Sequence, residues 1–384
     1  MKKIYDILSA LLFVSACIVS IFSARTISSV LKDGIYLCAF TVIPSLFPFM
    51  VITRFFSGTS ILVKAGSLFS PIITPLTGVK KELCGSFLMG LAGGFPNGAV
   101  SAGMTYSLGK CSKRDAEIAT ALSNNCSLVF VTAIAGTFAL GSIKNGLILL
   151  AAQFITVLIN SRIIAFCYKS SANPQPIFKP VSNSTDKENI SERVNWLRTL
   201  IESIKGAAAS AVNICAFILV FRVIAETTAQ LIFKNTTAVV IYKSLFEVTG
   251  AVAECRLVSF PLNIVLCSAA LGFSGISVIF QVADACFKYG LSPKPFIFSR
   301  ITSAFIMPVS TVVLLLVLPR TAISAFGYTG GNFLQYPVYS QINFAGIIAV
   351  YALFSCLAIG LLFLCYAIST FAERKSLKYT KNEK

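Results

Sequence analysis

Uncharged runs recur along the whole chain, and many of them are long enough to cross a bilayer. A hydrocarbon core of roughly 30 Å requires about 20 residues of helix. The uncharged runs cover residues 7–24, 34–53, 83–109, 118–143, 145–161, 206–221, 257–283, 301–319 and 345–371. This pattern predicts an all-α, multi-pass membrane protein in which some of these runs are not simple spans.

Composition agrees with this prediction. Of the 384 residues, 56% are apolar and 12% are charged, and the mean hydropathy is +0.81, which excludes an ordinary soluble protein. The first run follows two lysines and ends at small residues, so it has two interpretations, a cleaved signal peptide or a permanent span. The later spans make a cleaved signal unnecessary, and we favour a permanent span.

The run 83–109 contains a stretch, "GLAGGFPNGAV" at 90–100, that does not suit a regular spanning helix. Its glycines permit backbone angles that other residues avoid, its proline stops a helix, and its asparagine offers both a donor and an acceptor. The stretch predicts the tip of a re-entrant hairpin facing a solute, because a broken backbone is tolerated only against protein or water. The alternative is an ordinary span with a glycine packing face and a proline kink. The candidate binding residues here are Gly93, Gly94, Pro96, Asn97 and Gly98.

Two short motifs recur in the same order, which predicts a tandem duplication. "NGAV" at 97–100 corresponds to "TGAV" at 249–252, and "NCSLVFV" at 125–131 corresponds to "GISVIFQ" at 275–281. The spacing is 30 residues from Asn97 to Ser127 and 28 from Thr249 to Ser277. Each unit is expected to contain a hairpin and two spans, at 83–109, 117–140 and 145–168, then at 236–258, 262–287 and 296–319.

The second unit is predicted to enter the membrane inverted relative to the first. Between the units lie a polar segment, 169–198, and a single helix near 205–233, and one intervening span reverses the direction in which the second unit enters. Most of the 32 basic residues then fall on the side of the two termini, which marks that side as cytoplasmic. In the alternative, 236–252 crosses fully and 259–290 is the hairpin, so that the halves are parallel; Glu247 and the repeat match favour inversion.

This scheme divides the chain into five segments. They are N-terminal spans with an interfacial segment (1–82), the first repeat (83–168), a cytoplasmic loop with a linker helix (169–235), the inverted repeat (236–319), and an outer loop, last span and basic cytoplasmic tail (320–384).

The second tip, "FEVTGA", carries a carboxylate in an otherwise apolar segment. Such a residue is costly in a membrane and is taken as functional by default, so Glu247, Thr249 and Gly250 are candidate binding residues. Alternatively, Glu247 lies at the surface and pairs with Lys243 or Arg256.

The spans that face the two tips supply the remaining candidates. These are Asn124, Asn125 and Ser127 in the first unit and Ser274, Gly275, Ser277 and Gln281 in the second. Some of these side chains would alternatively hydrogen-bond to a neighbouring helix. Arg222 and Arg300 are candidates for pairing with an anionic solute, although snorkelling to the interface is the favoured interpretation for both.

Several function classes are disfavoured by what the sequence lacks. There is no histidine, the twelve cysteines are scattered singly, and no nucleophile–base pair or phosphate loop occurs, so we expect neither an enzyme nor a metal or other cofactor. The net charge of +17 is dispersed, so we expect no nucleic-acid binding. The expected partners are a small-molecule substrate and the lipid bilayer, with coupling to Na⁺ or H⁺ and a homo-oligomer both left open.

Several motifs resemble a known family. "MGLAGGFPNGA" followed by "KRDAEIATALSNNCSLVFV" resembles the gate, or nucleoside-recognition, domain of the YlbJ-type sporulation integral membrane proteins. "GFSGISVIFQVA" followed by "LSPKPFIFSR" is similar to its second half, and "IPSLFPFMVIT" to its N-terminal region. The resemblance covers roughly residues 30–320 and is most specific at the two glycine-rich motifs.

The resemblance implies a fold and a function. The family is distantly similar to concentrative nucleoside transporters, in which two inverted repeats of a hairpin and two spans meet at a mid-membrane site. It implies that the tips and facing helices named above form that site, and that the chain exports dipicolinic acid from the mother cell toward the forespore, across the mother-cell-derived membrane. A nucleoside transporter and a non-transporting assembly or regulatory protein of sporulation remain as alternatives. Phe95 stands where the family pattern has tyrosine, and no sodium site is identified.

Overall fold

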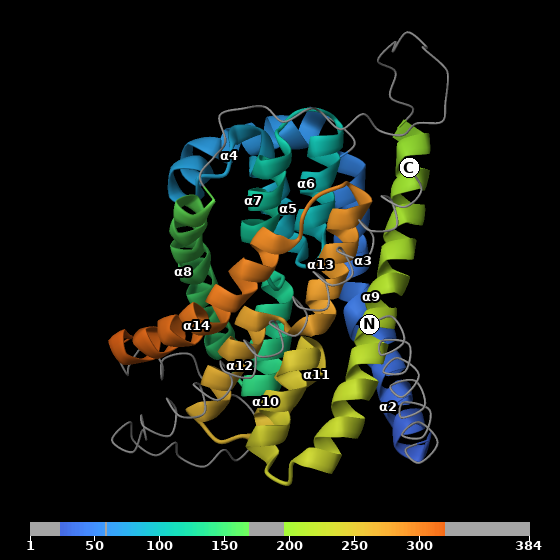
Figure 1. Ribbon diagram of the computed structural model, residues 1–384, viewed down its shortest axis with the longest axis vertical. Helices are drawn as coiled ribbons and strands as arrows, with labels where there is room; N and C mark the ends of the chain where they lie inside the picture. The colour runs from blue at the N-terminus through green and yellow to red at the C-terminus, as the bar shows by residue number, and fades with distance from the viewer. Residues whose placement is uncertain (1–23, 58–59, 169–195, 319–384) are drawn as a thin grey trace, which may run out of the picture.

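The computed structural model describes residues 24–57, 60–168 and 196–318, and this part of the chain contains helices and no strands (Figure 1). The last predicted span, nearly all of the first and most of the polar segment lie outside these residues. Four helical segments of the described chain are long and apolar enough to cross a membrane: Ile143–Cys167, Trp196–Ala229, Leu262–Lys288 and Lys294–Val317. The all-helical prediction is confirmed for the described residues, and the apolar helices support a membrane location.

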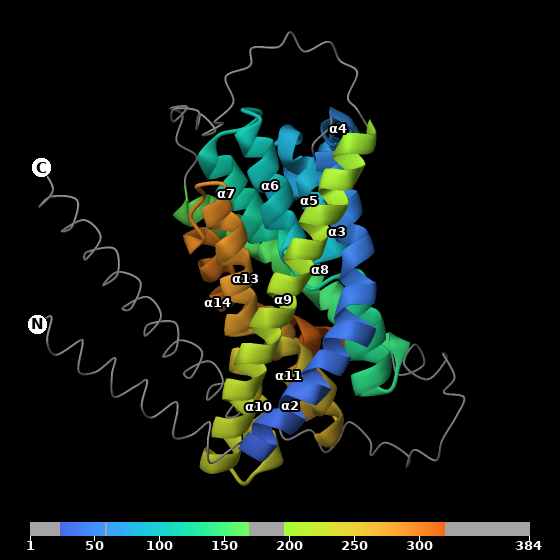
Figure 2. The same cartoon turned by 90° about the vertical axis from the view of Figure 1, so that its right-hand side faces the viewer.

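The N-terminal helices form a layer with one long helix from the middle of the chain. The layer consists of α2 (Ala24–Leu37), the π-helical turn η1 (Cys38–Val42), α3 (Ile43–Ser57) and α9 (Trp196–Ile232), and α4 (Ser60–Thr77) lies outside it. Figure 2 shows α9 running along α3 and crossing α2, and an apolar cluster that includes Met50 of α3 and Ile214 of α9 joins them. We call this the α3–α9 layer. Helix α4 instead lies across one end of the molecule (Figure 1).

The first predicted unit is interrupted twice. Its elements are η2 (Lys81–Leu83), α5 (Cys84–Gly93), α6 (Asn97–Ser107), α7 (Lys113–Ser123), the π-helix η3 (Phe130–Ala139) and α8 (Ile143–Cys167). The turn between α5 and α6 coincides with the break predicted at 90–100; Gly94 has φ +70° there, and the Phe95–Pro96 peptide is cis. The predicted span 117–140 is not one continuous helix, because α7 stops at Ser123 and helical structure resumes at Leu128, directly before η3.

The second predicted unit has the corresponding order of elements. It consists of α10 (Thr236–Phe246), α11 (Val248–Glu254), η4 (Cys255–Leu257), α12 (Leu262–Phe273), α13 (Gly275–Lys288) and α14 (Lys294–Val317). Glu247 separates α10 from α11, and Ser274, with φ +71°, separates α12 from α13. The predicted span 262–287 therefore consists of two helices. In Figure 1, α5 and α6 lie in the upper half of the molecule, and α10 and α11 lie in the lower half.

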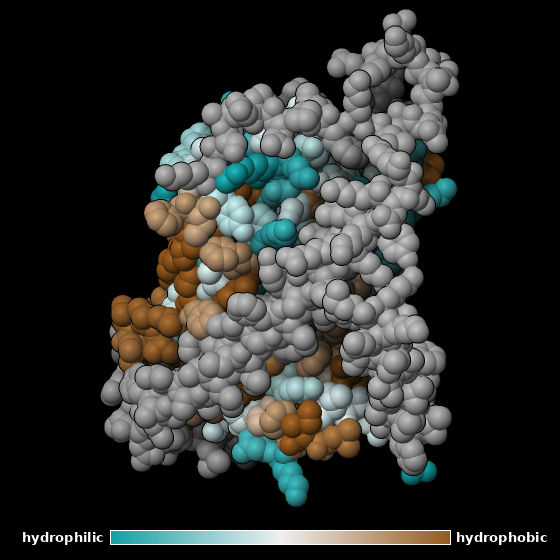
Figure 3. All heavy atoms as spheres, in the orientation of Figure 1, coloured by the Kyte–Doolittle hydropathy of each residue, from teal (hydrophilic) through white to brown (hydrophobic). Residues whose placement is uncertain are grey.

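Apolar side chains occupy both the interior and the flank. One large buried cluster joins the two units; its members include Leu122, Leu271 and Phe296. On the side of α8 and α14, apolar atoms form an exposed area, and hydrophilic atoms gather toward the two ends of the molecule (Figure 3). This distribution suits helices that stand across a bilayer with their ends in water.

Candidate functional site

A cavity of about 60 Å³ lies where the two units meet the α3–α9 layer. Five of the residues predicted from the sequence to bind a solute line it: Gly94, Ser127, Glu247, Thr249 and Gln281. They come from both tips, from the interruption after α7, and from α13. The rest of the wall is apolar apart from a cysteine, with Phe95 and Phe130 on one side and residues of η1, α3 and α9 on the other. Ligand sites commonly have this combination of an apolar wall and a few polar groups.

At the first tip, the backbone of Gly94 lies closer to the backbone of Ser127 than any larger residue would permit. Its φ of +70° is disfavoured for other residues, and an added Cβ would lie 2.9 Å from Ser127 N. Ser127 Oγ accepts a hydrogen bond from Phe130 N at 3.2 Å, where helical structure resumes after the interruption. The tip and the facing interruption therefore meet through backbone at one edge of the cavity.

The other predicted residues of the first tip hold it together and do not line the cavity. Asn97 Nδ2 donates to Gly93 O at 2.9 Å, so this side chain folds back onto its own turn. An added Cβ on Gly98 would lie 2.9 Å from Asn124 Nδ2, and Asn124 Oδ1 accepts from Ala99 N at 3.2 Å. Pro96 lies directly before α6. These contacts fix the hairpin against the end of α7.

At the second tip, the Glu247 carboxylate caps α11. Its Oε1 accepts from Thr249 N at 2.6 Å and its Oε2 from Gly250 N at 2.7 Å, and the residue is 3% exposed. A carboxylate at a helix N-terminus satisfies free N–H groups and interacts favourably with the helix dipole. The tip thus presents a carboxylate to the cavity with both oxygens already engaged by backbone.

The alternative pairing of Glu247 does not occur. Lys243 Nζ lies 3.0 Å from Glu254 Oε1 and also pairs with Glu226, while Arg256 lies over the ring of Phe138 at 5.5 Å. Glu247 is buried, so it is not a surface residue held by either cation.

Arg222 of α9 reaches the second tip, contrary to the prediction that it snorkels away. A Cβ added to Gly250 would clash with Arg222 Nη1 and would lie 3.3 Å from Glu247 Oε2. The guanidinium and the carboxylate therefore lie on the same side of Gly250. Arg222 Nε is buried without a hydrogen-bond partner in the described part of the chain.

The second interruption packs against the second tip. Ser274 Oγ donates to Leu271 O at 2.9 Å, and a Cβ on Gly275 would lie 3.0 Å from Phe246 O. Gln281 Nε2 donates to Ser277 Oγ at 3.1 Å. Of the four residues predicted in this stretch, Gln281 lines the cavity, and Ser274, Gly275 and Ser277 support the helix break behind it.

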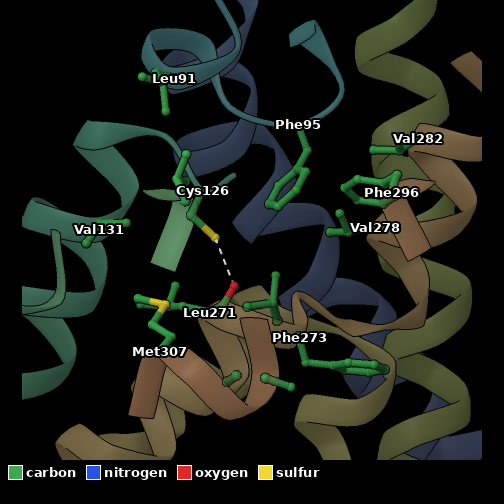
Figure 4. Packing of buried hydrophobic residues seen from close by; sticks show 14 of the residues in the cluster. Leu91, Phe95, Cys126, Val131, Leu271, Phe273, Val278, Val282, Phe296 and Met307 are labelled. Carbon is green, nitrogen blue, oxygen red and sulfur yellow. Dashed lines mark hydrogen bonds between the residues drawn. The ribbon is translucent and has the colours of Figure 1, made fainter. Parts of the chain in front are cut away.

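The two interruptions approach each other behind the cavity. Figure 4 shows the Cys126 thiol directed toward the carbonyl of Leu271, with Sγ 4.0 Å from the oxygen, and Phe95 on the far side of the thiol from Val131. Gln153 of α8 donates from Nε2 to Cys126 O at 3.0 Å, which satisfies a carbonyl released where α7 stops. Breaks in the helices are thus compensated by side chains of neighbouring helices, as a membrane interior requires.

Arg300 is buried, and the prediction that it snorkels was wrong. It is 2% exposed, its Nη2 donates to Asn125 Oδ1 at 3.0 Å, and its guanidinium lies 5.8 Å from the ring centre of Phe95 and 5.4 Å from that of Phe296. Asn125 therefore contacts α14 and does not line the cavity. Sequence reasoning missed Phe95 and Cys126 as wall residues, although both are neighbours of residues it singled out.

Comparison with known proteins agrees with the resemblance found in the motifs. Residues 39–144 match the family model described as Gate, nucleoside recognition, and no solved structure matches the chain. The chain is 24% identical over 328 residues to the sporulation integral membrane protein YlbJ of Bacillus subtilis (strain 168), covering 77% of this chain and 78% of the relative. The chain is therefore similar to gate-domain proteins through the first hairpin and to a sporulation membrane protein over most of its length.

Proposed function

We propose that this chain is a secondary transporter that moves a small polar or anionic solute across a membrane. One observation carries the proposal. Residues from both tips and from two facing helix segments line a single cavity between the two units and the α3–α9 layer. Interrupted helices gathered around a central site are a recurring design of secondary transporters.

The proposed mechanism is alternating access through a closed intermediate. A cavity of about 60 Å³ is smaller than the roughly 150 Å³ that admits benzene in an engineered protein core, so a solute requires this space to expand. We propose that the tips move against the α3–α9 layer, opening the cavity first to one side and then to the other. The placement of the hairpins in opposite halves of the molecule supports two gates in an inverted arrangement (Figure 1).

We propose dipicolinic acid as the solute, exported from the mother cell toward the forespore. The relative named as a sporulation integral membrane protein supports a role in spore formation. Two cationic side chains, Arg222 and Arg300, lie close to residues of the cavity wall, which favours an anion over a neutral solute. The corresponding location is the mother-cell-derived membrane, with both termini in the cytoplasm.

A nucleoside is the second candidate solute, because the matching family model is described by nucleoside recognition. Its aromatic base would suit the walls formed by Phe95 and Phe130. Neutral nucleosides differ from dipicolinate in charge, so flux measurements separate the two candidates.

The deciding experiment measures flux with the purified full-length chain in liposomes. We expect labelled dipicolinate to cross faster than in protein-free liposomes and faster than labelled uridine, with imposed Na⁺ and proton gradients identifying the coupling ion. Faster uridine flux would assign the nucleoside function instead. Absence of flux for both solutes under every gradient would favour a non-transporting role in assembly or regulation.

A further inference from the structure

Arg300 is a deeply buried cation held by uncharged groups. It lies on α14 and is 2% exposed, and its Nη2 donates to Asn125 Oδ1 at 3.0 Å and to Ser299 Oγ at 3.3 Å. The rings of Phe95 and Phe296 both lie within cation–π distance of the guanidinium. Arg300 Nε is buried and has no hydrogen-bond partner among the described residues. The guanidinium thus retains an unused donor.

Within the described residues, no carboxylate lies at ion-pair distance from this guanidinium. Lys243 shows the usual arrangement, since it is 9% exposed and is paired with both Glu226 and Glu254. Burying an uncompensated charge is costly, and buried charges in proteins are ordinarily paired. A buried arginine that keeps a free donor, and has no counter-charge among the described residues, is a candidate for binding an anion.

The position of Arg300 fits an anion that enters the cavity. Phe95, whose ring lies 5.8 Å from the guanidinium, lines the cavity. So does Cys126, which follows Asn125, the residue to which the guanidinium donates. Phe95 follows Gly94 of the first tip, so a movement of this tip would displace the ring that lies beside the guanidinium. The aromatic face stabilises the cation while no anion is present.

We propose that Arg300 is the residue that binds the anionic group of the transported solute, with Phe95 covering it in the closed state. This inference rests on the proposed transport function and names its substrate class as carboxylate anions. A planar guanidinium binds a carboxylate through two hydrogen bonds and is suited to the role. The competing explanation is structural, with Arg300 serving only to hold Asn125 in the interruption.

The test compares anions with a neutral compound of the same shape. Calorimetry on the purified full-length chain would measure binding of dipicolinate, isophthalate and the uncharged diamide of dipicolinic acid. The variants are Arg300→Gln, Arg300→Met and Arg300→Lys. The matched control is Arg162→Gln, which neutralises an exposed arginine that donates to Pro75 O on α4. Melting temperature of the unliganded protein, measured in parallel, reports folding.

We expect the wild-type chain and Arg162→Gln to prefer the dicarboxylates over the diamide by about 30-fold or more, the range for one buried charge pair. Arg300→Gln and Arg300→Met should lose the preference and still bind the diamide. Arg300→Lys should keep part of it. Arg300→Met removes a buried charge but also the donor to Asn125 Oδ1, two effects of opposite sign, so its melting temperature should stay close to that of the wild type.

Other outcomes overturn the inference. A preference for dicarboxylates that survives in Arg300→Gln or Arg300→Met places the anion elsewhere. Equal loss of all ligands together with a lower melting temperature identifies a structural role. Absence of any preference for the dicarboxylates in the wild type contradicts an anion site. If isophthalate binding depends on Arg300 but dipicolinate is not transported, the anion site stands and the transport proposal fails. If dipicolinate is transported but the chain binds dicarboxylates and the diamide equally well, the transport proposal stands and the anion site at Arg300 fails.

Discussion

Asn124 and Ala99 tie the first interrupted span to the first hairpin. The side-chain oxygen of Asn124 accepts a hydrogen bond from the backbone N–H of Ala99 at 3.2 Å, and its amide donates to Thr120 O at 2.8 Å. One asparagine therefore satisfies backbone groups from two helices, α6 and α7, at the point where α7 stops. The first tip and its facing segment are expected to move as one body.

Replacing Asn124 by alanine should destabilise the fold. The buried N–H of Ala99 would lose its side-chain acceptor, and an unsatisfied buried donor costs about 1–3 kcal/mol. The melting temperature of the detergent-solubilised full-length chain should fall. Asn145→Ala is the matched control, because Asn145 donates to Leu140 O in a half-buried turn outside the site. Equal melting of both variants would contradict a special role for Asn124.

Gly94→Ala and Gly78→Ala together separate backbone strain from the close approach at the first tip. Both glycines have φ near +70°, at +70° and +71°, but a Cβ at Gly78 meets no atom within 4 Å, whereas at Gly94 it would lie 2.9 Å from Ser127 N. Gly78→Ala should lose about 1–2 kcal/mol from strain alone. Gly94→Ala should lose more stability and also reduce solute flux. If the two variants melt and transport alike, the contact with Ser127 is unimportant.

Glu247→Gln should weaken transport while the protein still inserts and folds. A glutamine keeps one acceptor oxygen but turns an amide toward one of the two N–H groups, of Thr249 and Gly250, that the carboxylate now satisfies. We expect a loss of about 1–3 kcal/mol of stability from that mismatch, and a flux reduced well below wild type. Flux and melting temperature would be measured together.

Glu202→Gln supplies the control for that experiment. Glu202 pairs with Arg198 one helical turn away on the exposed side of α9, and its loss should change stability by about 0.5 kcal/mol or less. Wild-type flux in Glu247→Gln, with Glu202→Gln also normal, would remove Glu247 from the transport site.

The proposed inverted arrangement predicts that the ends of the two units face opposite compartments. Native cysteines are poor reporters of this topology. Cys255 is fully buried, and burial raises the pKa of the Cys111 thiol to about 12, so little reactive thiolate forms near neutral pH. Lys110 and Lys234 are exposed and lie in the α6–α7 and α9–α10 connections.

Single cysteines should therefore replace these two lysines in turn, in a chain whose native cysteines have been exchanged for serine or alanine. An impermeant thiol reagent added to intact cells should label Lys234→Cys, while Lys110→Cys should react only after the cells are opened. Labelling of both from the same side would rule out inversion. Unlabelled Lys234→Cys in opened cells would show that the connection is shielded.

Several elements were predictable from local sequence. Glycine and proline at 90–100 interrupt a helix whatever its tertiary contacts are, so the α5–α6 turn was located correctly. The single carboxylate in "FEVTGA" marked the second tip, because a charge in an apolar run needs backbone or charged partners, and Glu247 has backbone N–H groups.

The interruptions in the facing spans were less predictable. The stretches around Asn124 and Ser274 were expected to lie within continuous helices, because their polar residues also occur in helices that hydrogen-bond to one another. Their backbones leave the helix where groups distant in sequence, such as Gln153 Nε2 at Cys126 O, replace the missing hydrogen bonds. Such partners are not visible in a local pattern.

The sequence alone determined the helical class, the apolar runs and the positions of the breaks at the two tips. In a bilayer, backbone groups must form hydrogen bonds within the protein, so glycine, proline or a charge in an apolar run limits where a helix continues. Only the tertiary structure decided which candidate side chains share a cavity. In the folded chain, the Asn97 side chain hydrogen-bonds to the backbone of Gly93, whereas Gln281 lines the cavity. The tertiary structure also buried Arg300 against Asn125, 175 residues away, because α14 packs across the first interruption and removes that cation from the surface.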